Sequence, residues 1–221
     1  MKNLIRRSVI CLMGVAMLTA SGCNGKESKY TIATTTVDME AEVSAMLESE
    51  ITTTEDLSQD PSSNRQLTKR FGSFGMAEGW TEVPEHSSAP FYFTYVLAGT
   101  EHDEYPNNIT VYANASERKA EECAAFKKDI LDNLNAQAAS QNIQVEITDS
   151  SVISESGLEV LRFEIVKESN RTVQYYIVGD MQYVIVSASI YNEAKAKEDR
   201  IEEVAQSIVN SFVWSESGVK N

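Results

Sequence analysis

Residues that carry chemistry are scarce in this chain. Among its 221 residues are two histidines, His86 and His102, and three cysteines. The sequence lacks a Gly-x-Ser-x-Gly elbow, a His-Glu-x-x-His pair and a phosphate-binding glycine loop, which are typical of several large enzyme classes. Because both histidines fall in polar stretches predicted to be loops, little material is left for a catalytic triad. We therefore expect a protein that is not an enzyme and that holds no cofactor.

Basic residues are also few. The chain has 19 Lys and Arg residues against 33 Asp and Glu residues, which gives a formal net charge of -14. A surface this acidic repels nucleic acid and the anionic surface of a membrane. Nucleic acid is therefore excluded as a partner.

The apolar run at residues 9–18 is too short to span a membrane, because a spanning helix needs about 20 apolar residues. Lys2, Arg6 and Arg7 precede this run, and four small residues follow it before Cys23. A positive start, an apolar centre and a small-residue end are the three parts of an export signal. The sequence therefore predicts that residues 1–22 are a signal peptide.

The end of this segment, Ala20-Ser21-Gly22-Cys23, resembles the lipobox of bacterial lipoproteins. In that family the cysteine thiol receives a diacylglyceryl group, and a peptidase cleaves just before it. Ala20 departs from the family pattern, which more often has leucine there. The resemblance implies that acylated Cys23, the expected palmitate carrier, anchors the chain in the lipid bilayer and that the protein faces outside the cytoplasm. The alternative is an ordinary secretory signal followed by an incidental cysteine.

Residues 23–70 are predicted to form a flexible acidic tether. They are rich in Ser, Thr and Glu, and no aromatic residue follows Tyr30 within them. Such a segment buries too little apolar surface to offset the conformational entropy lost on folding. Apolar residues at helical spacing between residues 43 and 51 are also consistent with a short amphipathic helix within the tether.

Residues 71–214 are predicted to form one α+β domain, with residues 215–221 as a tail. Residues 79–83 are expected to form a turn after the first strand and to lead the chain into the core. One helix is expected to begin after a cap at Ser116 and to end near Ser140. A second helix is expected over residues 193–212. Short connections between strands favour an antiparallel sheet. We expect strands at residues 71–76, 91–97, 108–113, 145–153, 158–166, 172–178 and 182–190.

Glycine and aromatic residues allow more detailed predictions. Gly179-Asp180 fits a two-residue hairpin turn with glycine at a positive φ angle. The alternating aromatic residues Trp80, Phe91, Phe93 and Tyr95 are typical of a sheet core, with a ligand groove as the alternative. Three tyrosines fall on the opposite face, which we expect to be less buried, and they are the first places to seek a binding patch: Tyr92, Tyr176 and Tyr183.

The order of elements is similar to that of the PsbP-like superfamily. The features that carry the resemblance are Gly79-Trp80, the first strands, the long helix, the hairpin at residues 172–190 and a final helix ending in Ser211-Phe212. The resemblance implies a three-layer α/β/α sandwich around an antiparallel sheet. It also implies a binding or assembly role, because few members are enzymes. No functional residue is carried over, because the family shares no catalytic motif.

The densest group of potential metal ligands is Glu101-His102-Asp103-Glu104. A nitrogen and three carboxylates suit weak binding of a divalent cation, and His102, Asp103 and Glu104 are the weak candidates. Consecutive loop residues cannot all face one ion, so a solvated acidic connection is the preferred interpretation. Cys123 lies in a helical stretch beside Glu121 and Glu122, where acidic neighbours lower thiol reactivity, so we expect it to pack in the core.

These observations favour a membrane-anchored, extracytoplasmic lipoprotein that acts as a non-enzymatic binding or assembly module of the cell envelope. Its partner would be an envelope protein or a small ligand. The alternatives are a weak binder of divalent cations or small ligands that uses the acidic loop, and a hydrolase with an unrecognised site.

Overall fold

The structure, a computed structural model, describes residues 64–168 and 170–216. The expected signal peptide, the expected lipidation site Cys23 and nearly all of the expected tether lie outside the described residues. No helix of the described part is long and apolar enough to cross a membrane.

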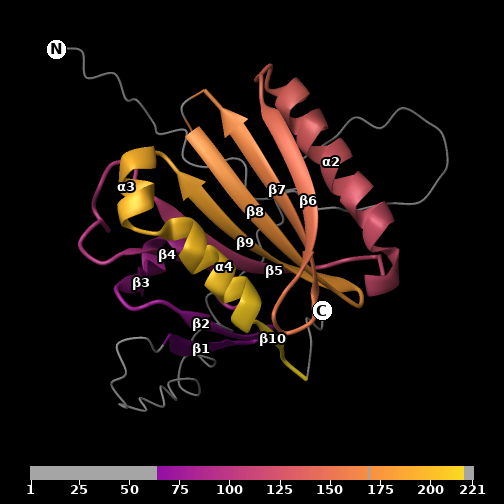
Figure 1. Cartoon of the computed structure of the whole chain (residues 1–221), viewed down its shortest axis with the longest axis horizontal. Helices are drawn as coiled ribbons and strands as arrows, with labels where there is room; N and C mark the ends of the chain where they lie inside the picture. The colour runs from indigo at the N-terminus through magenta and orange to yellow at the C-terminus, as the bar shows by residue number, and fades with distance from the viewer. Residues whose placement is uncertain (1–63, 169, 217–221) are drawn as a thin grey trace, which may run out of the picture. The chain divides into compact units, whose positions relative to one another are not determined.

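Two antiparallel sheets form the centre of the domain (Figure 1). The larger has seven strands in the order β3-β4-β5-β9-β8-β7-β6, and the smaller has three in the order β1-β2-β10. The elements follow one another as β1 (Arg65–Lys69), β2 (Gly72–Met76), β3 (Trp80–Glu82), the 3-10 helix η1 (Pro84–His86), β4 (Tyr92–Leu97), β5 (Asn108–Ala115), the 3-10 helix η2 (Ala120–Glu122), α2 (Cys123–Ser140), β6 (Glu146–Ile153), β7 (Glu159–Lys167), β8 (Asn170–Gly179), β9 (Gln182–Ile190), α3 (Glu193–Glu198), α4 (Ile201–Ser211) and β10 (Val213–Trp214).

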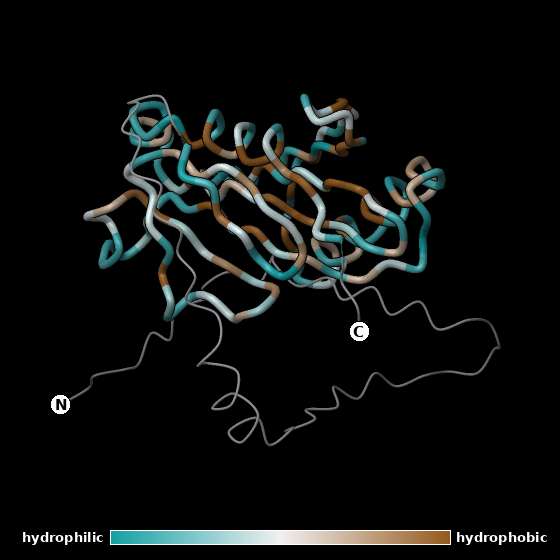
Figure 2. Tube along the Cα trace, turned by 90° about the horizontal axis from the view of Figure 1, so that it is seen from below, coloured by the Kyte–Doolittle hydropathy of each residue, from teal (hydrophilic) through white to brown (hydrophobic). Residues whose placement is uncertain are grey.

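Helix α4 and the small sheet cover one face of the large sheet. The apolar stripe of α4 includes Ile201, Ala205 and Ile208, and all of it is buried, as its spacing predicted. Phe74 of β2 completes this layer and meets Tyr95 of β4 edge to face. Hydrophobic residues gather along the strands, while the turns are mostly hydrophilic (Figure 2).

Helix α2 covers the opposite face of the large sheet. Its buried residues Phe126, Ile130 and Leu134 pack on side chains of β7, β8 and β9, among them Phe163 and Tyr176. The domain is therefore a three-layer α/β/α sandwich around an antiparallel sheet, and the predicted α+β class is confirmed.

The expected boundary between tether and domain at residue 70 is wrong, because strand β1 already pairs with β2 along its whole length. Leu67 is the one apolar residue of Arg65–Lys69, and most of the strand is exposed. An exposed edge strand of this kind has almost no apolar residues to reveal it in a sequence. The folded domain consequently includes Arg65–Lys69.

The expected start of the first helix at Ser116 is also wrong, because α2 begins at Cys123. The Ser116 hydroxyl accepts a hydrogen bond from the backbone N–H of Arg118 at 2.9 Å and so closes a local turn. The same turn holds the β8–β9 hairpin, because Ser116 N donates to Met181 O at 2.7 Å and Met181 N donates to Arg118 O at 3.0 Å. Ser116 and Arg118, which we expected in the first turn of the helix, therefore form hydrogen bonds with the hairpin instead.

The expected helix over residues 193–212 is in fact two helices. Arg200 adopts a left-handed φ of 53°, which ends α3 and lets α4 begin in a new direction. Asn192 caps α3 by accepting a hydrogen bond from Lys195 N at 3.1 Å. No glycine or proline marks the break, so the sequence pattern did not reveal it.

Gly179 does not occupy the positive-φ position expected of it. It is the last residue of β8, paired with Gln182, and the positive φ of 57° falls on Met181. A Cβ atom at Gly179 would lie 2.8 Å from the Trp214 ring, so glycine is required here by a close approach.

The aromatic predictions have mixed outcomes. Trp80, Phe93 and Tyr95 are core residues and Phe91 packs against them, as expected. The assignment of Tyr176 and Tyr183 to a less buried face is wrong, because both lie beneath α2. Tyr92 is half-buried and also packs against that cluster. Tyr176 and Tyr183 are therefore closed to a ligand, and a binding role for the part of Tyr92 that is exposed stays a prediction.

Candidate binding cleft

A cleft of about 540 Å³ lies beside α4, on the face of the large sheet that this helix only partly covers. The polar side of α4 forms one wall with Glu202, Glu203, Gln206 and Asn210. These residues are spaced by one, three and four positions, so they lie along one side of the helix, next to the buried stripe. Helix α4 packs over β9, β5 and β8 (Figure 1). The cleft lies between its polar side, Tyr175 of β8, Asn64 and Glu155 of the β6–β7 loop.

Tyr175 of β8 is the one aromatic residue that lines the cleft. Burial raises the pKa of its hydroxyl, and the guanidinium of Arg162 partly offsets that rise. The Arg162 guanidinium lies 6.0 Å from the centre of the Tyr175 ring. The hydroxyl therefore stays protonated at neutral pH and is available as a hydrogen-bond donor.

Hydrogen bonds hold the polar side chains of the cleft in fixed positions. Gln206 Nε2 donates to Asn210 Oδ1 at 3.0 Å, and Asn210 Nδ2 donates to Glu155 Oε1 at 2.8 Å. Asn64 Nδ2 donates to the Ser207 hydroxyl at 2.7 Å. The cleft is thus lined by oriented groups from the first described residue, the β6–β7 loop and α4.

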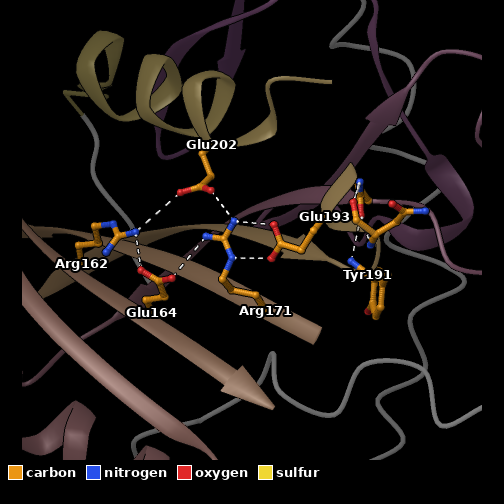
Figure 3. A network of polar contacts seen from close by, with 8 residues as sticks. Arg162, Glu164, Arg171, Tyr191, Glu193 and Glu202 are labelled. Atoms are coloured by element: carbon orange, nitrogen blue, oxygen red, sulfur yellow. Dashed lines mark hydrogen bonds and ion pairs between the residues drawn. The ribbon is translucent and has the colours of Figure 1, made fainter. Parts of the chain in front are cut away.

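A network of two arginines and three glutamates supports one end of the cleft (Figure 3). Arg171 of β8 binds Glu193 with two hydrogen bonds, at 2.8 and 3.2 Å, and its Nη2 lies 2.6 Å from Glu202 Oε1. Arg162 of β7 bonds to Glu164 at 2.9 Å, and Glu164 also lies 3.5 Å from Arg171. The network therefore joins the starts of α3 and α4 to the sheet.

The arginines and carboxylates of this network shift one another's pKa values. The hydrogen bonds that Arg171 donates to Glu193 and Glu202 raise the pKa of Arg171, and Arg171 in turn lowers the pKa of Glu193. Glu202 belongs both to the network and to the wall of the cleft. Its carboxylate is consequently oriented by Arg171 before any ligand arrives.

The cleft has an acidic and hydrogen-bonding character. Glu155, Glu202 and Glu203 line it, together with amide and hydroxyl side chains, and no lysine, arginine or histidine is among its described lining residues. Carboxylate oxygens accept hydrogen bonds from hydroxyl, amide and ammonium groups and repel anions. The arrangement suits a polar or cationic group and disfavours a phosphate or carboxylate.

The expected acidic loop does not assemble a metal site among the described residues, in which no group of three or more His, Cys, Asp or Glu side chains is placed to hold an ion. Glu101 accepts a hydrogen bond from Gly99 N at 2.8 Å, and Asp103 pairs with Lys195 at 3.3 Å. His102 and Glu104 are exposed. Metal binding by this loop stays a prediction.

Cys123 is a free, buried thiol at the start of α2, as expected. Burial raises the pKa of this thiol to about 12, and a hydrogen bond with Glu159 adds to the rise. The expectation named the neighbouring acids Glu121 and Glu122, whereas the contributing carboxylate belongs to β7. The thiol is therefore protonated and unreactive at neutral pH.

The sequence did not predict the cleft. Its residues come from the domain start, the β6–β7 loop, β8 and α4, and each looks like an ordinary surface position in its own segment. The sequence pattern predicted the polar side of α4. It did not predict that Tyr175, Glu155 and Asn64 would lie beside that side of the helix.

Comparison with known proteins does not assign this chain to a family. No family model and no curated protein matches it. The solution structure of cyanobacterial PsbP (CyanoP) from Synechocystis sp. PCC 6803 is similar, with 14% identity, a TM-score of 0.44, and coverage of 72% of this chain and 96% of that one.

Two further solved structures show weaker similarity. A crystal structure from Bacteroides thetaiotaomicron VPI-5482 is 12% identical, with a TM-score of 0.36, and the match covers 68% of this chain and 47% of that one. A protein of unknown function from Pseudomonas aeruginosa is 10% identical, with a TM-score of 0.32, covering 65% of this chain and 94% of that one. These values carry no argument about function, so the fold class rests on the layers described above.

Proposed function

We propose that this protein is a membrane-anchored lipoprotein, facing outside the cytoplasm, that acts as a non-enzymatic binding or assembly module through the cleft beside α4. The observation that carries the proposal is the cleft itself. Its volume of about 540 Å³ falls in the range of ordinary ligand sites, about 300–1,000 Å³. Its preferred partner carries hydrogen-bond donors or positive charge.

The membrane anchor is the part of the proposal that rests on sequence alone. The pattern at residues 20–23 supports acylation of Cys23. Cells fed a labelled fatty acid should label the wild-type chain and the Cys23→Ala variant should lose the label. The Cys123→Ala variant is the matched control and should keep it. Label retained on Cys23→Ala would refute the anchor while leaving the cleft untested by this experiment.

The cleft is tested by placing a photoreactive p-benzoyl-phenylalanine at position 206 of the full chain in its own cells. Gln206 is half-buried in the wall of the cleft. Illumination should give a discrete adduct, because a bound partner lies against this side chain. The same amino acid at the exposed position Lys128 on α2 should give no such adduct. Equal adducts from both positions, or none from position 206, would contradict the proposal.

The proposal assigns no catalysis to the domain. His86 lies in η1 and His102 in the loop after β4, and both are exposed. Among the carboxylates of the cleft, Glu202 is already held by Arg171. We infer that the cleft binds its partner without transforming it.

A further inference from the structure

Strand β6 forms one edge of the seven-stranded sheet, and no described strand pairs with its outer side. It is eight residues long and pairs with β7 at every position from Glu146 to Ile153, without a bulge. The opposite edge, β3, has three residues. Edge strands in natural proteins are usually kept short, interrupted, or provided with lysine or proline, because their free backbone groups recruit other strands. The sequence of β6 contains no lysine, arginine, proline or glycine.

The layers on both faces leave this edge open. The buried residues of α2 pack mainly on β7, β8 and β9. The layer reaches β6 through Ile147, which packs against the same cluster, and through Lys127, which pairs with Asp149. On the other face, α4 packs over β9, β5 and β8, and only Asn210 near its end reaches the β6–β7 loop, at Glu155. A further strand would lie about 4.8 Å beyond β6, outside the strands on which either helix mainly packs.

The end of β6 also exposes apolar side chains. Val152 is 38% exposed and Ile153 is 69% exposed, and they are two of the large hydrophobic residues that the described surface displays. They point to opposite faces of the sheet because they are neighbours on a strand. A partner strand beside β6 would cover both.

The sequence of β6 is complementary to itself in one antiparallel register. Directly opposite residues of an antiparallel pair share a face, so a two-fold axis must pass beside a single residue of each copy. With the axis at Ser150, Ile147 of each copy faces Ile153 of the other, and Thr148 faces Val152. Asp149 then faces Ser151 and Glu146 faces Ser154, so no two like charges meet.

Shifting the axis to Asp149 places the two Asp149 carboxylates opposite each other and sets Glu146 against Val152. Like charges directly opposite destabilise a strand pair. The Ser150 register avoids this repulsion and also sets the apolar residues Ile147 and Ile153 opposite each other. We propose that β6 is a self-association edge, at which a second copy of this chain adds its own β6 antiparallel about Ser150 and extends the sheet across both domains. This inference stands independently of the binding cleft and of the membrane anchor.

The test uses single cysteine substitutions in the full chain, in membranes from its own cells, with mild oxidation and non-reducing electrophoresis. Ser150→Cys places two thiols opposite each other across the axis, within the Cα separation of about 4.4–6.8 Å that a disulfide needs. Ser151→Cys and Asp149→Cys are the matched controls, because their symmetry mates lie diagonally, beyond about 7 Å. The Ser150→Cys dimer should form about tenfold faster than either control dimer, and the wild-type chain shows the background from its native cysteines.

A second substitution at an exposed position then shows whether the Ser150→Cys disulfide forms by specific pairing of β6 strands or by random collision. Ile153→Lys in the Ser150→Cys chain should abolish the disulfide-linked dimer, because it places a charge against Ile147 of the second copy. Met181→Lys, at the exposed tip of the β8–β9 hairpin, should leave it unchanged. Equal cross-linking at positions 149, 150 and 151 would overturn the proposal, as would a Ser150→Cys adduct to a different protein in place of the dimer.

Discussion

Two glycines of the domain are required by what lies beside them. A Cβ atom at Gly72 would lie 2.5 Å from the carbonyl oxygen of Val213 and 2.7 Å from the Phe212 ring. At Gly179 it would meet the Trp214 ring. Both contacts bring the C-terminal strand β10 against the rest of the domain. Neither contact could be predicted from the sequence, because no local sequence pattern marks a close approach between segments far apart in the chain.

The Gly72→Ala substitution should lower the free energy of unfolding by about 1–3 kcal/mol, because the added methyl group must push backbone atoms apart. Urea unfolding followed by tryptophan fluorescence measures this change. Ser73→Ala, at the half-exposed neighbouring position, should change the free energy by less than about 0.5 kcal/mol. Similar losses for the two variants would show that the contact at Gly72 is not restrictive.

Two buried tyrosines differ in whether their hydroxyl groups have a hydrogen-bond partner. Tyr95 is fully buried, and its hydroxyl has no hydrogen-bond partner among the described residues, whereas the Tyr176 hydroxyl donates to Gln174 Oε1 at 3.1 Å. Tyr95→Phe should leave the free energy of unfolding unchanged or raise it, because an unpaired polar group is removed from the core. Tyr176→Phe should lower it by about 1 kcal/mol, because the Gln174 side chain loses its partner. Chemical denaturation of both variants checks this, and a larger loss for Tyr95→Phe would contradict it.

At the scale of elements, the helices and most strands were predictable because their apolar residues recur at period two or near 3.6. Strand β9 has the predicted bounds, and the alternation of Leu161, Phe163 and Ile165 in β7 marks a face buried under α2. Strand β1 was missed because its one apolar residue, Leu67, gives no period. The break at Arg200 was missed because it occurs at a left-handed φ in a residue type that also suits a helix, with no glycine or proline to mark it.

The contact between α3 and β8 should depend on pH. Arg171 lowers the pKa of Glu193 in the folded chain, whereas glutamate in an unfolded chain titrates near about 4.3. A depressed folded pKa adds stability above the unfolded value, and that stability is lost as pH falls through the folded value. The melting temperature of Glu193→Gln should therefore fall below that of the wild type at pH 7, and the gap should close below about pH 4.

A matched variant separates this pair from a general effect of charge. Glu198→Gln removes a carboxylate from the same helix, at an exposed position away from Arg171. Its melting temperature should differ from that of the wild type by less than that of Glu193→Gln at pH 7. A gap for Glu193→Gln that persists unchanged at pH 3 would show that Arg171 does not stabilise the fold through this carboxylate.

At the scale of the whole molecule, layer order was predictable and the binding site was not. Amphipathic helices before and after an antiparallel meander can cover the two faces of one sheet, which is the arrangement observed. The cleft depends on how far α4 extends across that sheet, and this is set by the packing of Phe212, Trp214 and the small sheet at its end. The network at Arg171 likewise joins residues that are far apart in the sequence.

The central claim is that the cleft beside α4 holds the partner. It is tested most directly by measuring the adduct from the photoreactive residue at position 206 after the cleft has been filled. Asn210→Trp places a large ring between α4 and Glu155, whereas Asn135→Trp places the same ring on the exposed side of α2. Thermal melting of both variants confirms that each remains folded. The account predicts that Asn210→Trp reduces the adduct by about tenfold, equivalent to ~1.4 kcal/mol of binding, and that Asn135→Trp leaves it unchanged. An undiminished adduct in folded Asn210→Trp would contradict the claim.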